Sequence, residues 1–273
     1  MITTLEGLMK SALCVGINDY PVRGTDLKGC VNDAQSWAAL LTGHFGFEPA
    51  NVTTLLDKQA TKGRILSRLD RLITGSAKGD VLVFTNSSHG TYVADDNGDE
   101  SRYDEAICPY DMKKNLIVDD ELRERFAQLP AGVRLSVISD SCFSGSVTRG
   151  DGLETPDDRR RRFINPSILG RREIAGVRRK AVPRSVEKYP ERKMREVLVS
   201  GCRDNQYSYD ARFGKVYHGA MTYFALEIIR AADYRLTYDD LWNELVVRLD
   251  AEGYDQEPQV EGKATTKRRL LFS

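Results

Sequence analysis

RLSVISDSCFSGSVTRG (residues 134–150) begins as an apolar run and ends in a stretch of small residues. Residues 133–139 are rich in Val, Leu and Ile, which is typical of a buried strand. Asp140 and Cys142 follow directly, so this strand would be a rigid mount that presents a thiol. In open α/β sheets, the loops at the carboxyl ends of the strands carry the chemistry. The stretch therefore predicts a strand and a functional site at its end.

Three further apolar runs resemble residues 133–139, namely 11–17, 80–85 and 196–201. Helical spacing of apolar residues occurs at 32–45, 61–74, 119–129, 219–232 and 237–249. Alternating strands and helices predict an α/β fold, a three-layer α/β/α sandwich with a central, mostly parallel sheet. With 273 residues and 41% hydrophobic composition, the chain is long enough to bury a full core.

Residues 151–195 break this periodicity, because Arg pairs, prolines and glycines replace it. The formal net charge of the chain is zero, yet residues 159–195 hold 14 Arg and Lys against three Glu. We interpret 151–195 as a basic, flexible, solvated loop within one domain, 1–273. It would separate a larger part, 1–150, from a smaller part, 196–273.

The spacing of the cysteines and the hydropathy of the chain indicate the cellular compartment in which the protein works. Five cysteines are widely spaced without a CxxC pair, which favours free thiols in a reducing environment. No apolar run approaches the roughly 20 residues that span a bilayer, and the start of the chain lacks a signal-peptide pattern. We expect a cytoplasmic protein with no membrane partner.

A histidine follows residues 80–85 much as Cys142 follows residues 133–139. The chain reads NSSHGTYV there, with His89 before Gly90. If the two strands are parallel neighbours, both side chains emerge at one sheet edge, where the imidazole can activate the thiol. The backbone N–H groups of Gly90 and Cys142 would then stabilise an oxyanion, so the pattern predicts acyl transfer. A buried structural cysteine and a hydrogen-bonded core histidine are the alternatives. His218 also precedes a glycine, but at an expected helix start, so it is a weaker candidate base.

Four ordered motifs together resemble the metacaspases, which are caspase-like cysteine peptidases. They are VGINDYP with LKGCVNDA, then SSHGTYV, then YDEAICPYD with IVDDEL, then DSCFSGS; the resemblance resumes at VLVSGCRDNQYSYD and GAMTYFAL. It implies a caspase-like fold and a cysteine endopeptidase that cleaves protein substrates after Arg or Lys. It also implies His89 as the base and Cys142 as the nucleophile.

The resemblance further implies a pocket for the basic side chain of the substrate, built from Asp33, Asp140 and Ser87. Paired carboxylates suit a guanidinium, whose planar fork offers several donors. The residues alone leave another role open for Asp33, which with Asn32 could cap a helix. Cys30 lies next to the pocket segment, where a small buried residue is the simplest interpretation.

Acidic residues at 95–111 and at 119–120 supply oxygen ligands of the kind that calcium prefers, although the spacing excludes an EF-hand. The resemblance implies Asp104, Asp119 and Asp120 as calcium ligands. Arg149 stands where the family commonly has another aspartate. Because a cation opposes a divalent ion, we expect a weakened site or an internal salt bridge in its place. A solvated acidic loop is the alternative, and the predicted chemistry itself requires no cofactor.

An acidic pocket and a basic loop in one chain suggest that the loop is a substrate. Caspase-like enzymes are often activated by cleavage of this connection, so the resemblance implies a zymogen cut within residues 159–195. The cut would be made by the protein itself or by an upstream protease. The candidate sites are Arg162, Arg172, Lys180 and Arg184. By family analogy, the role would be regulated proteolysis in stress, cell death or defence.

Two other functions stay open at this point. One is a catalytically silent scaffold that binds basic peptides in the acidic cleft, which would not need both Cys142 and His89. The other is a nucleic-acid-associated protein that uses the basic loop and binds less tightly as salt rises. Nucleic acid is the less favoured partner, because few aromatic residues accompany the basic run and the remainder of the chain is acidic.

Overall fold

A central six-stranded sheet organises the computed structural model, which describes residues 8–94, 103–142, 158–170, 193–203 and 206–273. The strand order is β12-β9-β7-β3-β1-β2. Strands β9 to β2 in this order are parallel, and β12 pairs antiparallel with β9 at one edge. The strands are β1 (Lys10–Gly16), β2 (Val52–Leu56), β3 (Val81–Ser87), β7 (Arg134–Asp140), β9 (Glu196–Ser200) and β12 (Gln259–Glu261).

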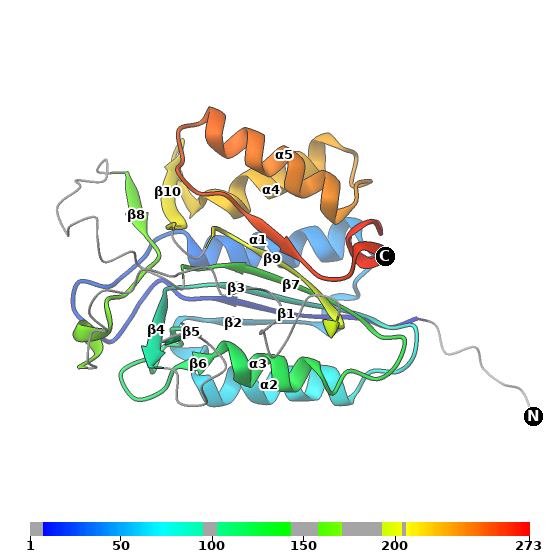
Figure 1. The fold of residues 1–273 in the computed structure, drawn as a ribbon, viewed down its shortest axis with the longest axis horizontal. Helices are drawn as coiled ribbons and strands as arrows, with labels where there is room; N and C mark the ends of the chain where they lie inside the picture. Colours follow the sequence, from blue (N-terminus) through cyan, green and yellow to red (C-terminus); the bar gives the residue numbers. More distant parts are fainter. Residues whose placement is uncertain (1–7, 95–102, 143–157, 171–192, 204–205) are drawn as a thin grey trace, which may run out of the picture.

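Helices cover both faces of this sheet, as Figure 1 shows. On one side lie α1 (Cys30–His44), α4 (Ala220–Ala231) and α5 (Tyr238–Ala251), and on the other side lie α2 (Lys62–Thr74) and α3 (Asp119–Phe126). Shorter helices are α6 (Ala264–Lys267) and the 3-10 helices Pro49–Asn51, Asp57–Gln59 and Pro166–Leu169. The predicted three-layer α/β/α sandwich is therefore confirmed.

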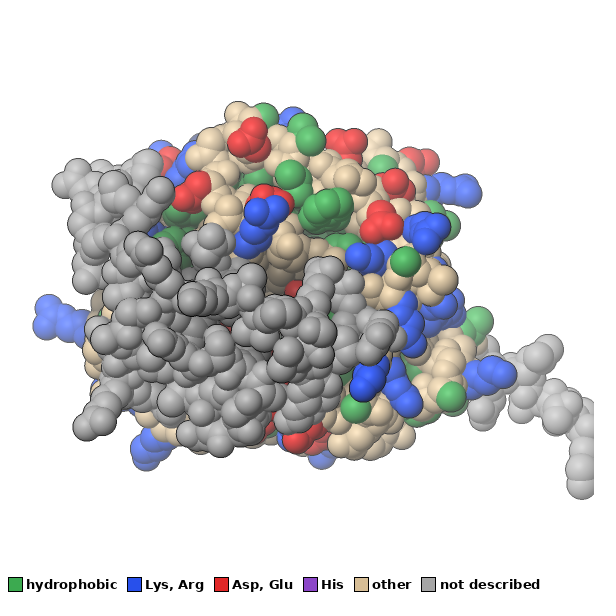
Figure 2. Space-filling view, viewed as in Figure 1, with side chains coloured by type: hydrophobic (Ala, Val, Ile, Leu, Met, Phe, Trp, Pro, Cys, Tyr) green, Lys and Arg blue, Asp and Glu red, His purple; other side chains and the backbone are tan. Residues whose placement is uncertain are grey.

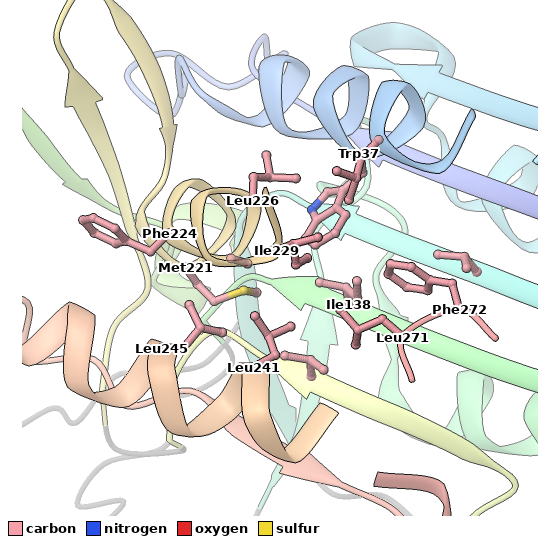
Figure 3. Packing of buried hydrophobic residues seen from close by; sticks show 14 of the residues in the cluster. Trp37, Ile138, Met221, Phe224, Leu226, Ile229, Leu241, Leu245, Leu271 and Phe272 are labelled. Carbon is pink, nitrogen blue, oxygen red and sulfur yellow. The ribbon is translucent and has the colours of Figure 1, made fainter. Parts of the chain in front are cut away.

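Two buried apolar clusters fix the layers, one on each face of the sheet. Successive side chains of a strand point to opposite faces, so Val83 belongs to one cluster and Phe84 to the other. Figure 3 shows part of the cluster on the side of α4 and α5, where Met221 and Leu245 point toward each other. Because β3 and β7 are buried on both faces, their carboxyl ends are rigidly held.

Two three-stranded sheets lie outside the central one, and the apolar pattern predicts neither of them. The first joins β4 (Gly90–Ala94), β5 (Tyr103–Ile107) and β6 (Ile117–Val118); the second joins β8 (Arg159–Arg161), β10 (Tyr209–Phe213) and β11 (Val216–Gly219). Strand β8 lies beside β10 in Figure 1 and pairs antiparallel with it.

Residues 158–170 belong to the segment expected to be a solvated loop, and here the structure differs. They form β8 and a 3-10 helix, and Arg162 is 0% exposed. The high charge of the segment suggested solvation, but backbone pairing with β10 and acidic partners for the guanidinium outweigh the cost of burial.

The surface charge, the cysteines and the character of the helices agree with a folded globular domain. Figure 2 shows one face of the molecule, on which Lys and Arg side chains lie among Asp and Glu side chains where described residues are visible. All five cysteines are free, as the sequence predicts, and all five are buried. Within the described ranges, no helix combines the length and the apolar character that crossing a membrane requires.

Candidate active site

The carboxyl ends of β3 and β7 bring a histidine and a cysteine to one edge of the sheet. The two strands are parallel neighbours, and Ser87 pairs with Asp140. His89 and Cys142 each follow two residues later, so they leave the sheet at the same level. Both side chains are buried, with 1% and 0% exposure. The expectation that these strands are adjacent is confirmed.

Two backbone N–H groups at this edge converge on one carbonyl oxygen, that of Arg162. The Gly90 N–H donates to it at 3.0 Å and the Cys142 N–H at 3.2 Å. A Cβ atom on Gly90 would lie 1.8 Å from the Cys142 carbonyl oxygen, so only glycine allows this approach. Paired donors at such distances are suited to stabilise an oxyanion that develops on that carbonyl.

His89 is held in one tautomer. Its Nε2 lies 2.7 Å from the Thr25 carbonyl oxygen, and because a carbonyl only accepts, Nε2 carries the proton. The Nδ1 atom then has a free lone pair, is buried, and has no hydrogen-bond partner among the described residues. Burial lowers the pKa of His89 to about 3, against the Thr25 contact, which raises it. The imidazole is therefore neutral near pH 7, and Nδ1 is its unprotonated nitrogen.

The thiol of Cys142 rests on the backbone of Ser208. It donates to the Ser208 carbonyl at 3.3 Å and accepts the Ser208 N–H. The Cys202 thiol also lies against it, and this hydrogen bond, followed by burial, raises the pKa of Cys202 well above its usual value.

The pocket that the sequence predicts for a basic side chain contains the guanidinium of Arg162. Nη2 lies 2.7 Å from an Asp33 carboxylate oxygen, and Nη1 donates to Ser87 Oγ at 2.6 Å. Nη1 also lies 3.0 Å from the Asp140 carbonyl oxygen and 3.4 Å from its carboxylate. Asp210 adds a third carboxylate, 3.0 Å from Nη2. The structure thus brings Asp33, Asp140 and Ser87 together around one cation.

The pKa values of the two predicted aspartates are shifted in opposite directions, because the ion pair outweighs burial only at Asp33. For Asp33, burial raises the pKa, but Arg162 and then His218 outweigh it, so the pKa is lowered. His218 Nδ1 lies 2.9 Å from Asp33, which makes His218 a wall of the pocket. For Asp140, burial raises the pKa, with Asp33 adding to it and Arg162 opposing it. A bound cation therefore stabilises the ionised form of both buried carboxylates.

Glycine at 219 makes room for the guanidinium. A Cβ atom there would lie 2.1 Å from an Asp140 carboxylate oxygen and 2.4 Å from Nη1 of Arg162. The Gly219 N–H also donates to both Asp33 carboxylate oxygens, at 3.0 and 3.1 Å. Cys30, placed beside the pocket by the sequence, is fully buried there, and burial raises its pKa well above the usual value although Arg162 lowers it.

Sequence reasoning missed several residues of this site. Asp210 lies in the short strand β10, whose mixed polarity gives no strand signal, although the motif YSYD ends on it. Ser208 and Thr25 act through backbone atoms, which no residue type reveals. Gly219 could have been found as the glycine that opens the expected helix 219–232 and follows His218.

The predicted calcium ligands Asp104, Asp119 and Asp120 do not form a metal-binding group within the part of the chain that the structure describes, so calcium binding stays a prediction. Asp119 pairs with Arg123 at 3.4 Å, and within the described ranges no group of three or more His, Cys, Asp or Glu could hold a metal ion. Burial raises the pKa of Asp119, as does Asp120, against Arg123. Asp104 is buried on β5. Arg149 and the candidate cleavage residues Arg172, Lys180 and Arg184 lie outside the described residues.

Known proteins resemble this chain in sequence. A family model described as metacaspase, peptidase C14 domain, matches residues 10–149. Metacaspase-1 of Arabidopsis thaliana is 33% identical over 259 residues, covering 90% of this chain and 66% of that protein. Metacaspase-4 of the same plant is 40% identical over 147 residues, covering 51% and 34%. This chain therefore spans between a third and two thirds of the length of these relatives.

Solved structures give the same architecture. The protein GSU0716 from Geobacter sulfurreducens has a TM-score of 0.70 and 25% identity, covering 97% of this chain and 98% of that one. Caspase-1 from Spodoptera frugiperda has a TM-score of 0.59, covering 93% and 86%. At 13% identity, the second likeness concerns the fold alone.

Proposed function

The chain belongs to the metacaspase family of caspase-like peptidases, and we propose that it is a cysteine endopeptidase that cleaves proteins after Arg or Lys. One observation carries the proposal. The guanidinium of Arg162 lies among three carboxylates while its own carbonyl oxygen receives the N–H groups of Gly90 and Cys142. This is the position that a substrate residue needs just before the cleaved bond.

The chemistry follows from these atoms. The Cys142 thiol gives its proton to Nδ1 of His89 while the sulfur bonds to the carbonyl carbon, and the carbonyl electrons move to the oxygen between the two N–H groups. Collapse breaks the C–N bond, and His89 returns the proton to the leaving amine. Water then attacks the thioester, with His89 as base, and releases the new carboxylate and the thiol. Thr25 holds the imidazole in the tautomer that these steps require.

Arg is expected to be a better substrate residue than Lys. The fork of Arg162 places Nη1 and Nη2 against oxygen atoms of Asp33, Ser87, Asp140 and Asp210 at once. A lysine ammonium is a single point charge and cannot bridge partners on two sides of the pocket in the same way. Asp at this position would meet three carboxylates and is expected to be excluded.

We further propose that the described state is latent, because Arg162 occupies the pocket that substrates need. The Arg162–Phe163 bond is then the first one cut, and a tethered segment competes at an effective concentration of about millimolar. Cleavage by the chain itself or by an upstream protease, followed by departure of the segment, would give the active form. The five free thiols favour the reducing cytoplasm as its compartment.

Peptide hydrolysis and intact mass test both steps. The wild-type chain and Cys142→Ala are incubated with fluorogenic peptides that end in Arg, Lys or Asp, and the chain mass is followed over time. We expect Arg above Lys, no cleavage after Asp, loss of at least about 1,000-fold in Cys142→Ala, and fragments 1–162 and 163–273 in the wild type only. Cys14→Ala, another buried thiol remote from these atoms, is the matched control. Full turnover by Cys142→Ala would remove the peptidase proposal.

A further inference from the structure

Residues 158–164 cross the candidate active site in an extended track that is held through backbone groups. β8 pairs with β10, with Arg161 opposite Tyr209 and Arg159 opposite Ala211. Further backbone hydrogen bonds join Arg212 N–H to Asp158 O at 3.0 Å, Arg162 N–H to Ser208 O at 2.9 Å, and Ile164 N–H to Gly90 O at 2.9 Å. Because such bonds do not depend on side chains, another extended peptide could occupy the same track. Side-chain contacts of the segment therefore indicate what the track selects.

Two arginines of β8 lie over tyrosine rings. The Arg161 guanidinium carbon is 4.3 Å from the centroid of the Tyr207 ring, and that of Arg159 is 3.9 Å from the centroid of the Tyr254 ring. Both arginines are half-buried, which removes part of the water that weakens a cation–π contact. Tyr254 itself is 7% exposed and packs against Tyr209 and Phe224, so its ring is fixed in place.

Arg159 has a second set of partners at the carboxyl end of α5. Nη1 donates to the Gly253 carbonyl at 2.8 Å and Nη2 to the Glu252 carbonyl at 3.2 Å. These carbonyls directly follow the helix, where the helix dipole favours a cation. A ring face together with two carbonyls suits the flat fork of arginine better than an ammonium group.

Arg160, between Arg159 and Arg161, does not lie over a tyrosine ring. Its side chain is exposed, and its guanidinium contacts the carbonyl of Gly24. An exposed hydrogen bond of this kind exchanges readily with water and contributes little to binding. The track therefore alternates: positions 159 and 161 meet rings, whereas position 160 faces solvent.

We propose that Tyr207 and Tyr254 form two further specificity subsites, which select substrates with Arg at the second and fourth residues before the cleaved bond. The proposal rests on the proposed peptidase function and names its substrate class: exposed polybasic segments of the form Arg-X-Arg-Arg. After the chain's own segment departs, the same two rings receive the basic residues of the substrate.

A peptide series on the full, processed chain tests this. The parent peptide carries Arg at positions one, two and four before the bond and Ala at position three, and Ala replaces Arg at position two or four in turn. We expect kcat/KM to fall about five- to tenfold for each replacement. Introducing Arg at position three is the matched control and should change kcat/KM less than about twofold. Tyr254→Leu should abolish the preference at position four, while Tyr254→Phe, which keeps the ring, should retain it.

The outcomes separate the two proposals. Equal kcat/KM for Arg and Ala at positions two and four, with cleavage after Arg still dependent on Cys142, would overturn the subsites and leave the peptidase proposal standing. No cleavage of any peptide would remove both. The peptide substitutions do not alter the protein, so a variant at Tyr254 that fails to fold leaves their result valid.

Discussion

In two regions of the molecule an arginine neutralises a buried or half-buried carboxylate. The two arginines differ in how far along the chain they lie from their partners. In the pocket, Arg162 is 0% exposed and reaches Asp33 from a segment 129 residues along the chain. Within α3, Arg123 pairs with Asp119 four residues earlier, with side-chain exposures of 25% and 22%. A cation from a distant segment can be exchanged for that of a substrate, whereas a cation from the same helix turn is part of the element. Under the proposed function, Arg162 stands in for a substrate residue, whereas Arg123 and Asp119 form a structural ion pair.

The largest expected effect comes from removing each arginine in turn. Arg162→Ala leaves three buried carboxylates without their cation and should lower the free energy of unfolding by about 3–5 kcal/mol. Arg123→Ala should cost less, because water partly reaches its ion pair with Asp119. Urea unfolding measures both. Equal losses would erase the distinction between the two regions, and Arg162→Lys should recover part of the loss.

A smaller effect is expected from a substitution that adds a side-chain atom to the pocket instead of removing the arginine from it. Gly219→Ala places a methyl group against the guanidinium site, so kcat/KM for a peptide ending in Arg should fall about 100-fold. Gly43→Ala is the matched control, because nothing lies within 4 Å of its added Cβ and it sits within α1. That control should keep full activity and gain up to about 1 kcal/mol of stability. Equal kinetics for the two variants would contradict a tight pocket.

A third effect is a pH dependence. The pKa of His89 is about 3 in the fold and about 6.5 when unfolded, so the unfolded chain binds more protons between these values. His89 therefore stabilises the fold fully above about pH 6.5, and this part is lost at up to about 1.4 kcal/mol per pH unit as the pH falls toward 3. The free energy of unfolding of the wild type minus that of His89→Gln, measured from pH 7 to 4, should show this slope. If the difference in the free energy of unfolding does not change with pH, water reaches the imidazole of His89, as it reaches the Arg123–Asp119 pair in α3.

Periodicity explains how much of the fold could be predicted. The strands β1, β3, β7 and β9 are continuous apolar runs, so both they and the adjacent ends that carry His89 and Cys142 follow from the sequence. Strand β2 was missed because it reads VTTLL, with Thr at positions that are only half-buried or exposed. The occupant of the pocket could not be predicted either, since nothing local distinguishes Arg162 from the three arginines before it. Only the pairing of β8 with β10 selects which one is buried.

The neighbours in the central sheet decide what would happen after a cut at Arg162. β7 belongs to the first fragment and β9 to the second, yet the two strands are hydrogen-bonded along five residue pairs, Leu135 with Glu196 through Ser139 with Ser200. Both apolar clusters also draw residues from each side of the cut. Scission would thus yield a nicked molecule whose halves stay interlocked as a single particle, and its change in activity would come from one freed strand end rather than from dissociation.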